Sequence, residues 1–332
     1  MKEKRLFKFG ILALSIVLIA CTGGSSEAGC PEIDGREINV VATTPMIGEF
    51  VSQVGGDNIN LTVLMPAEAD PHTYEPAPQD AGTIADADLV FYTGLKYEPA
   101  ALIKLLENSA CSAEVLAEVG ESVFPIEFKE GGHDDHDEEG HDDDEEGHDD
   151  HAGHDHGAYD PHFWFDPNRV AYAAEYIESK LVEFDSSNAS EYEAAGKAYV
   201  TELKGLVGQV SELISTIPSQ NRRLITTHES LGYLEAKFGL EVLSTIIPSV
   251  DSANEISPSQ LVGVIDVIED NNVKVIFIEA EAPSVYAETI VAETGIKAVE
   301  GLWVETLKEG QSYPEFLLDA VELIVENLRN TD

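Results

Sequence analysis

Basic residues are scarce in this chain of 332 residues. Only 19 Lys and Arg stand against 63 Asp and Glu, which gives a formal net charge of −44 at pH 7. So negative a surface repels phosphate backbones and anionic lipid headgroups. Nucleic acids and anionic membrane surfaces are therefore poor partners, and cations are natural ones. Solubility, or adaptation to a salty environment, is the alternative explanation of the same charge.

The apolar run at the amino end, 11–20, is too short to cross a bilayer. It follows a basic segment, as the core of a signal peptide does. The junction Leu-Ile-Ala-Cys at 18–21 resembles the lipobox of bacterial lipoproteins, which implies cleavage before Cys21 and lipid attachment to its sulfur. We therefore expect a lipoprotein signal peptide at 1–20 and a lipidated, flexible tether at 21–36. The alternative is an ordinary signal peptide with an incidental cysteine.

Cysteine is also rare, with three in the whole chain. If Cys21 carries lipid, Cys30 and Cys111 remain. Outside the cytoplasm two such residues can pair, although the sequence does not show how far apart they lie. A disulfide and two free buried thiols both stay open.

Signatures of catalysis are missing. The sequence has no His-Glu-x-x-His pattern and no glycine-rich phosphate loop. His228 and Glu229 are adjacent, but no second histidine follows at the spacing that a catalytic zinc site needs. We therefore do not expect an enzyme.

Strand-like and helix-like segments alternate along most of the chain, which favours an α/β fold with mainly parallel sheets. The predicted strands are 38–43, 59–64, 89–92, 115–116, 123–128, 224–227, 241–246, 273–278 and 298–304. The predicted helices are 47–54, 78–86, 99–108, 167–184, 189–216, 231–238, 258–269, 285–294 and 314–328.

One of these helices is unusually long. We place a linking helix at 187–217, which would span on the order of 40 Å and suits a strut between an amino-terminal lobe, 37–186, and a carboxyl-terminal lobe, 218–332. An ordinary long surface helix is the alternative.

A stretch of Gly, His, Asp and Glu at 130–157 interrupts the first lobe. It has almost nothing apolar to bury, so we expect it to be disordered without metal. It could collect metal ions loosely, or be a solvated and dispensable loop, since flexible ligands lose chain entropy when they order. Most of the ten histidines lie there: His133, His136, His141, His148, His151, His154 and His156.

The other three histidines are His72, His162 and His228, and each lies beside a predicted strand end or helix start. The first two follow Asp-Pro, and proline stiffens such a turn. In open α/β sheets, ligands bind beyond the carboxyl ends of the strands. Two lobes facing each other would bring these imidazoles to one cleft, although a single loop histidine is more often a surface residue.

Three motifs carry a resemblance. Asp-Pro-His-Thr-Tyr-Glu-Pro at 70–76, Asp-Pro-His-Phe-Trp-Phe-Asp-Pro at 160–167 and Thr-His-Glu-Ser-Leu-Gly-Tyr-Leu at 227–234 resemble the metal-binding proteins of bacterial ABC uptake systems for zinc and manganese. The likeness covers essentially the whole mature chain. It implies two similar α/β lobes joined by a rigid helix, with one metal in the cleft between them.

The same resemblance implies that the protein delivers metal to an ABC permease. With the lipobox, we expect a monomer that is anchored by lipid to the outer face of the cell membrane. His72 and His162 would come from the first lobe, and His228 would be the third ligand. Glu305 stands at the position of the fourth, where the family usually has Asp. Because Glu is one methylene longer, Glu300 or a water molecule is the alternative.

Three imidazoles and one carboxylate suit zinc, whereas manganese prefers more oxygen ligands. By resemblance, the histidine-rich insert is a feature of the zinc-type members. We therefore expect Zn²⁺, with Mn²⁺ or iron as the alternative. More distant alternatives are a surface adhesin or metal store, and a zinc metallohydrolase.

Overall fold

The computed structural model describes residues 30, 33, 35–128, 159–252, 254–281 and 285–329. The predicted signal peptide, the lipidation site Cys21 and the histidine-rich insert at 130–157 lie outside these residues. Within them, no helix is both long and apolar enough to cross a membrane.

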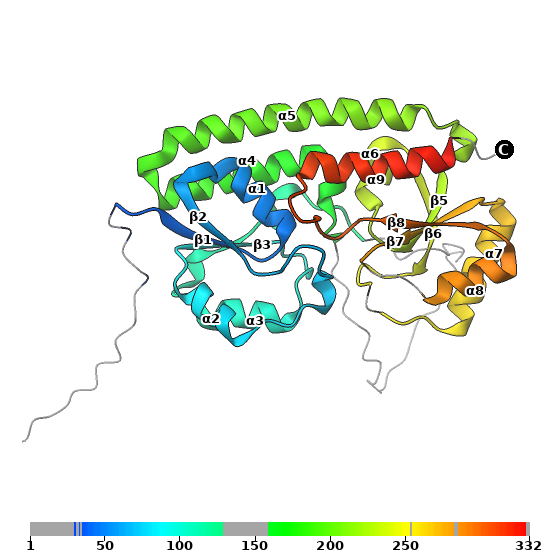
Figure 1. The fold of residues 1–332 in the computed structure, drawn as a ribbon, viewed down its shortest axis with the longest axis horizontal. Helices are drawn as coiled ribbons and strands as arrows, with labels where there is room; N and C mark the ends of the chain where they lie inside the picture. Colours follow the sequence, from blue (N-terminus) through cyan, green and yellow to red (C-terminus); the bar gives the residue numbers. More distant parts are fainter. Residues whose placement is uncertain are drawn as a thin grey trace, which may run out of the picture.

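Two four-stranded parallel sheets form the frame of the molecule, as the alternation of segments predicts (Figure 1). The first sheet has the order β2 (Ile59–Val63), β1 (Ile38–Ala42), β3 (Leu89–Tyr92) and β4 (Leu116–Glu118). The second has the order β6 (Glu241–Ile247), β5 (Arg223–His228), β7 (Val275–Glu279) and β8 (Lys297–Leu302). The two lobes thus share one strand order, and the predicted fold class is confirmed.

One predicted strand is wrong. Residues 123–128 do not pair as a strand, because a 3-10 turn ends at Val123 and Phe124 takes a left-handed φ of 54°. Pro125 then lacks the N–H that a ladder needs. Only Glu127 makes an isolated antiparallel bridge, with Tyr159.

Helices cover both faces of the sheets (Figure 1). On the outer face of the first sheet lie α2 (Pro78–Ala85) and α3 (Ala100–Ser109), and beside the second lie α7 (Pro258–Asn271) and α8 (Val285–Thr294). The opposite layer, common to both lobes, contains α1 (Pro45–Gly55), α4 (Pro167–Phe184), α5 (Ala189–Ser215), α6 (Gly232–Phe238) and α9 (Tyr313–Leu328).

The long helix α5 runs above both lobes, along nearly the whole width of the molecule (Figure 1). Its 27 residues correspond to about 40 Å. Its buried residues recur at helical spacing, from Tyr192 through Leu203 to Ile214, so one stripe of the helix packs on α4 and α9.

The lobes share one hydrophobic core. The last helix, α9, packs aromatic side chains against the first lobe: the Phe50 and Tyr313 ring centroids lie 5.3 Å apart, and those of Phe165 and Phe316 lie 5.8 Å apart. A single cluster of buried residues therefore extends from the first sheet to the second. Because packed cores resist continuous deformation, this arrangement opposes a wide hinge motion between the lobes.

Cys30 and Cys111 form a disulfide, with Cα atoms 4.9 Å apart. The sequence leaves open either a disulfide or two free buried thiols, and the structure contains the disulfide. It ties the amino end of the first lobe to the segment that follows α3.

Candidate metal centre

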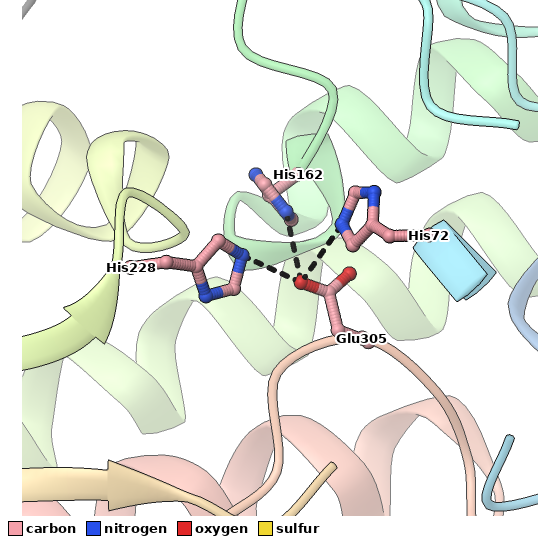
Figure 2. Close-up of side chains that lie close together, drawn as sticks. All are labelled: His72, His162, His228 and Glu305. Carbon is pink, nitrogen blue, oxygen red and sulfur yellow. Dashed lines mark hydrogen bonds and ion pairs between the residues drawn. The ribbon is translucent and has the colours of Figure 1, made fainter. Parts of the chain in front are cut away.

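Four side chains from distant parts of the chain converge between the lobes (Figure 2). They are His72, His162, His228 and Glu305, and one ligand atom from each lies within 4.8 Å of all the others. The side chains of His162, His228 and Glu305 are fully buried, and that of His72 is 4% exposed. The structure thus brings together the four residues that the sequence analysis singles out.

The two Asp-Pro-His segments form the same kind of turn. The Asp70 carboxylate accepts the backbone N–H of His72 at 2.9 Å, and the Asp160 carboxylate accepts that of His162 at 2.8 Å. In each turn the intervening proline sets its own φ near −65°. Local contacts therefore stabilise the backbone at both histidines.

Two further carboxylates orient the imidazole rings. Nδ1 of His162 lies 2.8 Å from Asp160 Oδ1, and Nδ1 of His228 lies 2.5 Å from Glu279 Oε2. With the proton of Nδ1 donated to a carboxylate, Nε2 is the nitrogen that faces the site. Asp160 and Glu279 therefore orient the two rings so that each Nε2 faces the converging group.

Sequence reasoning did not give Asp160 and Glu279 this role. Signals were present: Asp160 lies two residues before His162, and Glu279 ends a buried apolar strand that neighbours the strand of His228. An acidic residue at the carboxyl end of a parallel strand points to the ligand-binding edge of the sheet.

All three imidazoles approach one oxygen of Glu305 (Figure 2). The distances from Oε1 to Nε2 are 3.4 Å for His72, 3.2 Å for His162 and 2.7 Å for His228. The last pair is close enough for an ion pair, but its alignment does not make a hydrogen bond, so the buried Nε2 of His228 has no hydrogen-bond partner. A divalent cation can bind nitrogens that converge in this way, and it would give the unpartnered Nε2 of His228 a partner.

The close approach of histidines and carboxylates shifts the pKa values of both. Burial lowers the pKa of His162, but the Glu305 charge and the hydrogen bonds to Asp160 and Glu305 outweigh it and raise the pKa to about 9. For His228, the charges of Glu279 and Glu305 likewise overcome burial and raise the pKa well above its ordinary value. Burial would raise the pKa of Glu305, yet the three imidazoles hold it well below its usual range. A bound cation would replace these protons.

Glu281 anchors the loop that carries Glu305. One of its oxygens accepts the backbone N–H groups of Val304 at 3.1 Å, Glu305 at 3.0 Å and Thr306 at 3.3 Å. Burial, and next the nearby charge of Glu305, raise the pKa of Glu281 to about 7. Nothing in the local sequence distinguishes this residue, because its role depends on a loop that lies more than twenty residues away.

The other predicted site residues lie elsewhere. Glu300, the alternative fourth ligand, is exposed on β8 and is not a member of the converging group. The seven histidines of the insert and Cys21 fall outside the described residues. Glu229 lies beside His228 in sequence, but its carboxylate accepts a hydrogen bond from the Thr245 hydroxyl at 3.0 Å.

A family model matches most of this chain, and curated relatives and a solved structure resemble it. Residues 40–327 match the family described as "ZnuA: Zinc-uptake complex component A periplasmic". Among curated relatives, the manganese-binding lipoprotein MntA of Halalkalibacterium halodurans is 23% identical and the high-affinity zinc uptake system protein ZnuA of Bacillus subtilis is 28% identical, each over 96% of both chains. The periplasmic zinc-binding protein TroA of Treponema pallidum shares the fold, with a TM-score of 0.72 at 22% identity over 88% of this chain and 99% of that one.

Proposed function

Since this chain belongs to the periplasmic zinc-uptake component A family, we propose that it captures Zn²⁺ outside the cytoplasm and delivers it to an ABC permease for uptake. Proteins of this family are metal-binding components of ABC transporters. They are solute-binding proteins and not enzymes.

The proposal depends above all on the donor set. We assign His72, His162, His228 and Glu305 as the metal ligands, because their donor atoms already converge in a buried site. Three imidazole nitrogens and one carboxylate oxygen match the four-coordinate preference of Zn²⁺. Mn²⁺ favours sites richer in oxygen. The names of relatives do not choose between these metals, since one is named for zinc and another for manganese.

We further propose how the chain is arranged at the cell surface. A lipid on Cys21 anchors a monomer to the outer face of the membrane through the tether 21–36. Two lobes, 37–186 and 218–332, are joined by the segment 187–217, and the insert 130–157 serves as an accessory, low-affinity metal collector. Relatives that are named lipoproteins support the anchor.

Competition titrations on purified, metal-free protein test the choice of metal. We expect one tight Zn²⁺ site per chain and much weaker Mn²⁺ binding. His162→Ala should abolish the tight site, because it removes a buried ligand. Tighter binding of Mn²⁺ than of Zn²⁺ would overturn the zinc assignment.

A further inference from the structure

We propose that Tyr97 determines metal specificity by holding the second oxygen of Glu305, so that the carboxylate offers a single oxygen to the metal. A site restricted in this way favours four-coordinate Zn²⁺ over Mn²⁺. The inference rests on the proposed function of the site, and it assigns a role to a residue that is not itself a ligand.

The two oxygens of Glu305 have different partners. Oε1 faces the three imidazoles (Figure 2), whereas Oε2 accepts a hydrogen bond from the Tyr97 hydroxyl at 2.9 Å. The same hydroxyl lies 3.0 Å from the backbone carbonyl oxygen of Glu305. Tyr97 is 1% exposed, so water does not compete for this contact.

Packing on several sides holds the Tyr97 ring in place. Its centroid lies 5.1 Å from that of His72, 6.0 Å from that of His162 and 5.2 Å from that of Trp164, each in an edge-to-face arrangement. Two of these neighbours are proposed ligands. The hydroxyl oxygen therefore cannot move away from Glu305 without moving rings that belong to the site.

The loop before Tyr97 is strained. Gly94, Leu95 and Lys96 have φ values of 75°, 54° and 62°, a run of left-handed conformations that two of these residues rarely adopt. Such strain persists where surrounding contacts impose it, and it is common at functional sites.

Two glutamates impose this conformation. Glu98 accepts the backbone N–H groups of Thr93 at 2.6 Å and Gly94 at 2.9 Å, and Glu118 accepts that of Leu95 at 3.0 Å. The loop is thus fixed on both sides of its turn, and the fixed turn directs Tyr97 toward Glu305.

The chemistry of the two metals makes this contact selective. Zn²⁺ is satisfied by four ligands, which the three imidazoles and Oε1 supply. Mn²⁺ prefers more oxygen ligands, and Oε2 of the same carboxylate is an additional one. If Oε2 bound the metal, the hydrogen bond from Tyr97 would weaken or break. Binding of Mn²⁺ would carry this energetic cost, whereas binding of Zn²⁺ would not, because Zn²⁺ does not need Oε2.

Tyr97→Phe removes the hydroxyl and keeps the ring. We expect the ratio of Zn²⁺ to Mn²⁺ affinity to fall about tenfold, roughly the worth of one hydrogen bond to a charged group, through a gain in Mn²⁺ affinity. With Co²⁺ as a spectroscopic probe, the ligand-field bands should weaken as the coordination number rises. Tyr192→Phe is the matched control, because Tyr192 is likewise buried and its hydroxyl donates to a carboxylate, that of Asp185, at 2.8 Å, while neither residue belongs to the proposed site or to the loop before Tyr97. It should leave both readouts unchanged.

An unchanged affinity ratio and Co²⁺ spectrum in Tyr97→Phe would show that Tyr97 only packs, and would overturn the inference. X-ray absorption on the Zn²⁺-loaded wild type provides a test that needs no variant. More than four ligands around the Zn²⁺ would also overturn the inference. Failure of the wild type to bind Zn²⁺ tightly would instead refute the proposed function, so the two failures are distinguishable.

Discussion

The indole N–H of Trp164 donates a hydrogen bond of 2.8 Å to the carbonyl oxygen of Val304, the residue before Glu305. The backbone oxygen of Trp164 in turn accepts a hydrogen bond of 2.7 Å from the hydroxyl of Tyr313. These bonds fasten the first lobe to the second directly beside the proposed metal site. Together with the shared core, they restrict how far the lobes can separate when metal binds or leaves.

We therefore predict that release of metal involves small movements of loops and lobes. Small-angle scattering of the metal-free and the Zn²⁺-loaded protein should give radii of gyration that do not differ resolvably. The physical reason is that a wide hinge would break the packing of α9 on the first lobe. A clear compaction on loading would contradict this prediction.

Affinity for Zn²⁺ should fall as the solution becomes more acidic. In the metal-free protein the pKa of His162 is raised to about 9, so below that pH this imidazole must lose a proton to bind metal. Each such proton costs about tenfold in affinity per pH unit, or roughly 300-fold between pH 7.5 and pH 5. The pKa of Glu305 is lowered, so this carboxylate stays ionised over the range and adds no such cost.

Calorimetric titration in two buffers with different heats of protonation measures the protons released at each pH. We expect release at pH 7.5, since both His162 and His228 have raised pKa values. Equal affinities at pH 5 and pH 7.5, or binding with no release of protons, would contradict the protonation of these imidazoles in the metal-free site.

Glu279→Gln should weaken Zn²⁺ binding about 10- to 100-fold, because the neutral amide no longer holds the Nδ1 proton of His228 as strongly. Fluorescence competition against a chelating dye can measure the loss. Glu300→Gln is the matched control: Glu300 is exposed, and its substitution should leave affinity unchanged. A comparable loss in Glu300→Gln would restore Glu300 as a candidate ligand.

Deletion of 131–157 should leave one tight Zn²⁺ site per chain while lowering the total number of ions bound at high Zn²⁺ concentration. The four proposed ligands lie outside the deleted segment, and flexible ligands bind more weakly because ordering them costs chain entropy. Equilibrium dialysis gives both quantities. His228→Ala in the full chain is the complementary control, since it should remove the tight site and keep the loose ones. If the deletion abolished tight binding, the tight site would depend on the insert and not on the four proposed ligands alone.

Much of the fold could be predicted because it depends on short-range patterns. Apolar runs of four to seven residues became strands, and helical spacing predicted α5 almost to its ends. The failure at 123–128 has a local cause as well, since a proline and a left-handed phenylalanine interrupt a largely apolar run. The disulfide could not be decided from sequence, because 81 residues separate Cys30 from Cys111.

The sequence by itself determined the alternating fold and the two Asp-Pro-His turns, because proline geometry and an aspartate two residues before a histidine act over a few bonds. Only the tertiary structure decided that Glu305, and not Glu300, meets the imidazoles, and that Tyr97 reaches Glu305 across 208 residues of chain. Such contacts depend on how two lobes and their shared core pack together. No local pattern encodes that packing, since a carboxylate on one loop looks the same in sequence whether it is exposed or buried.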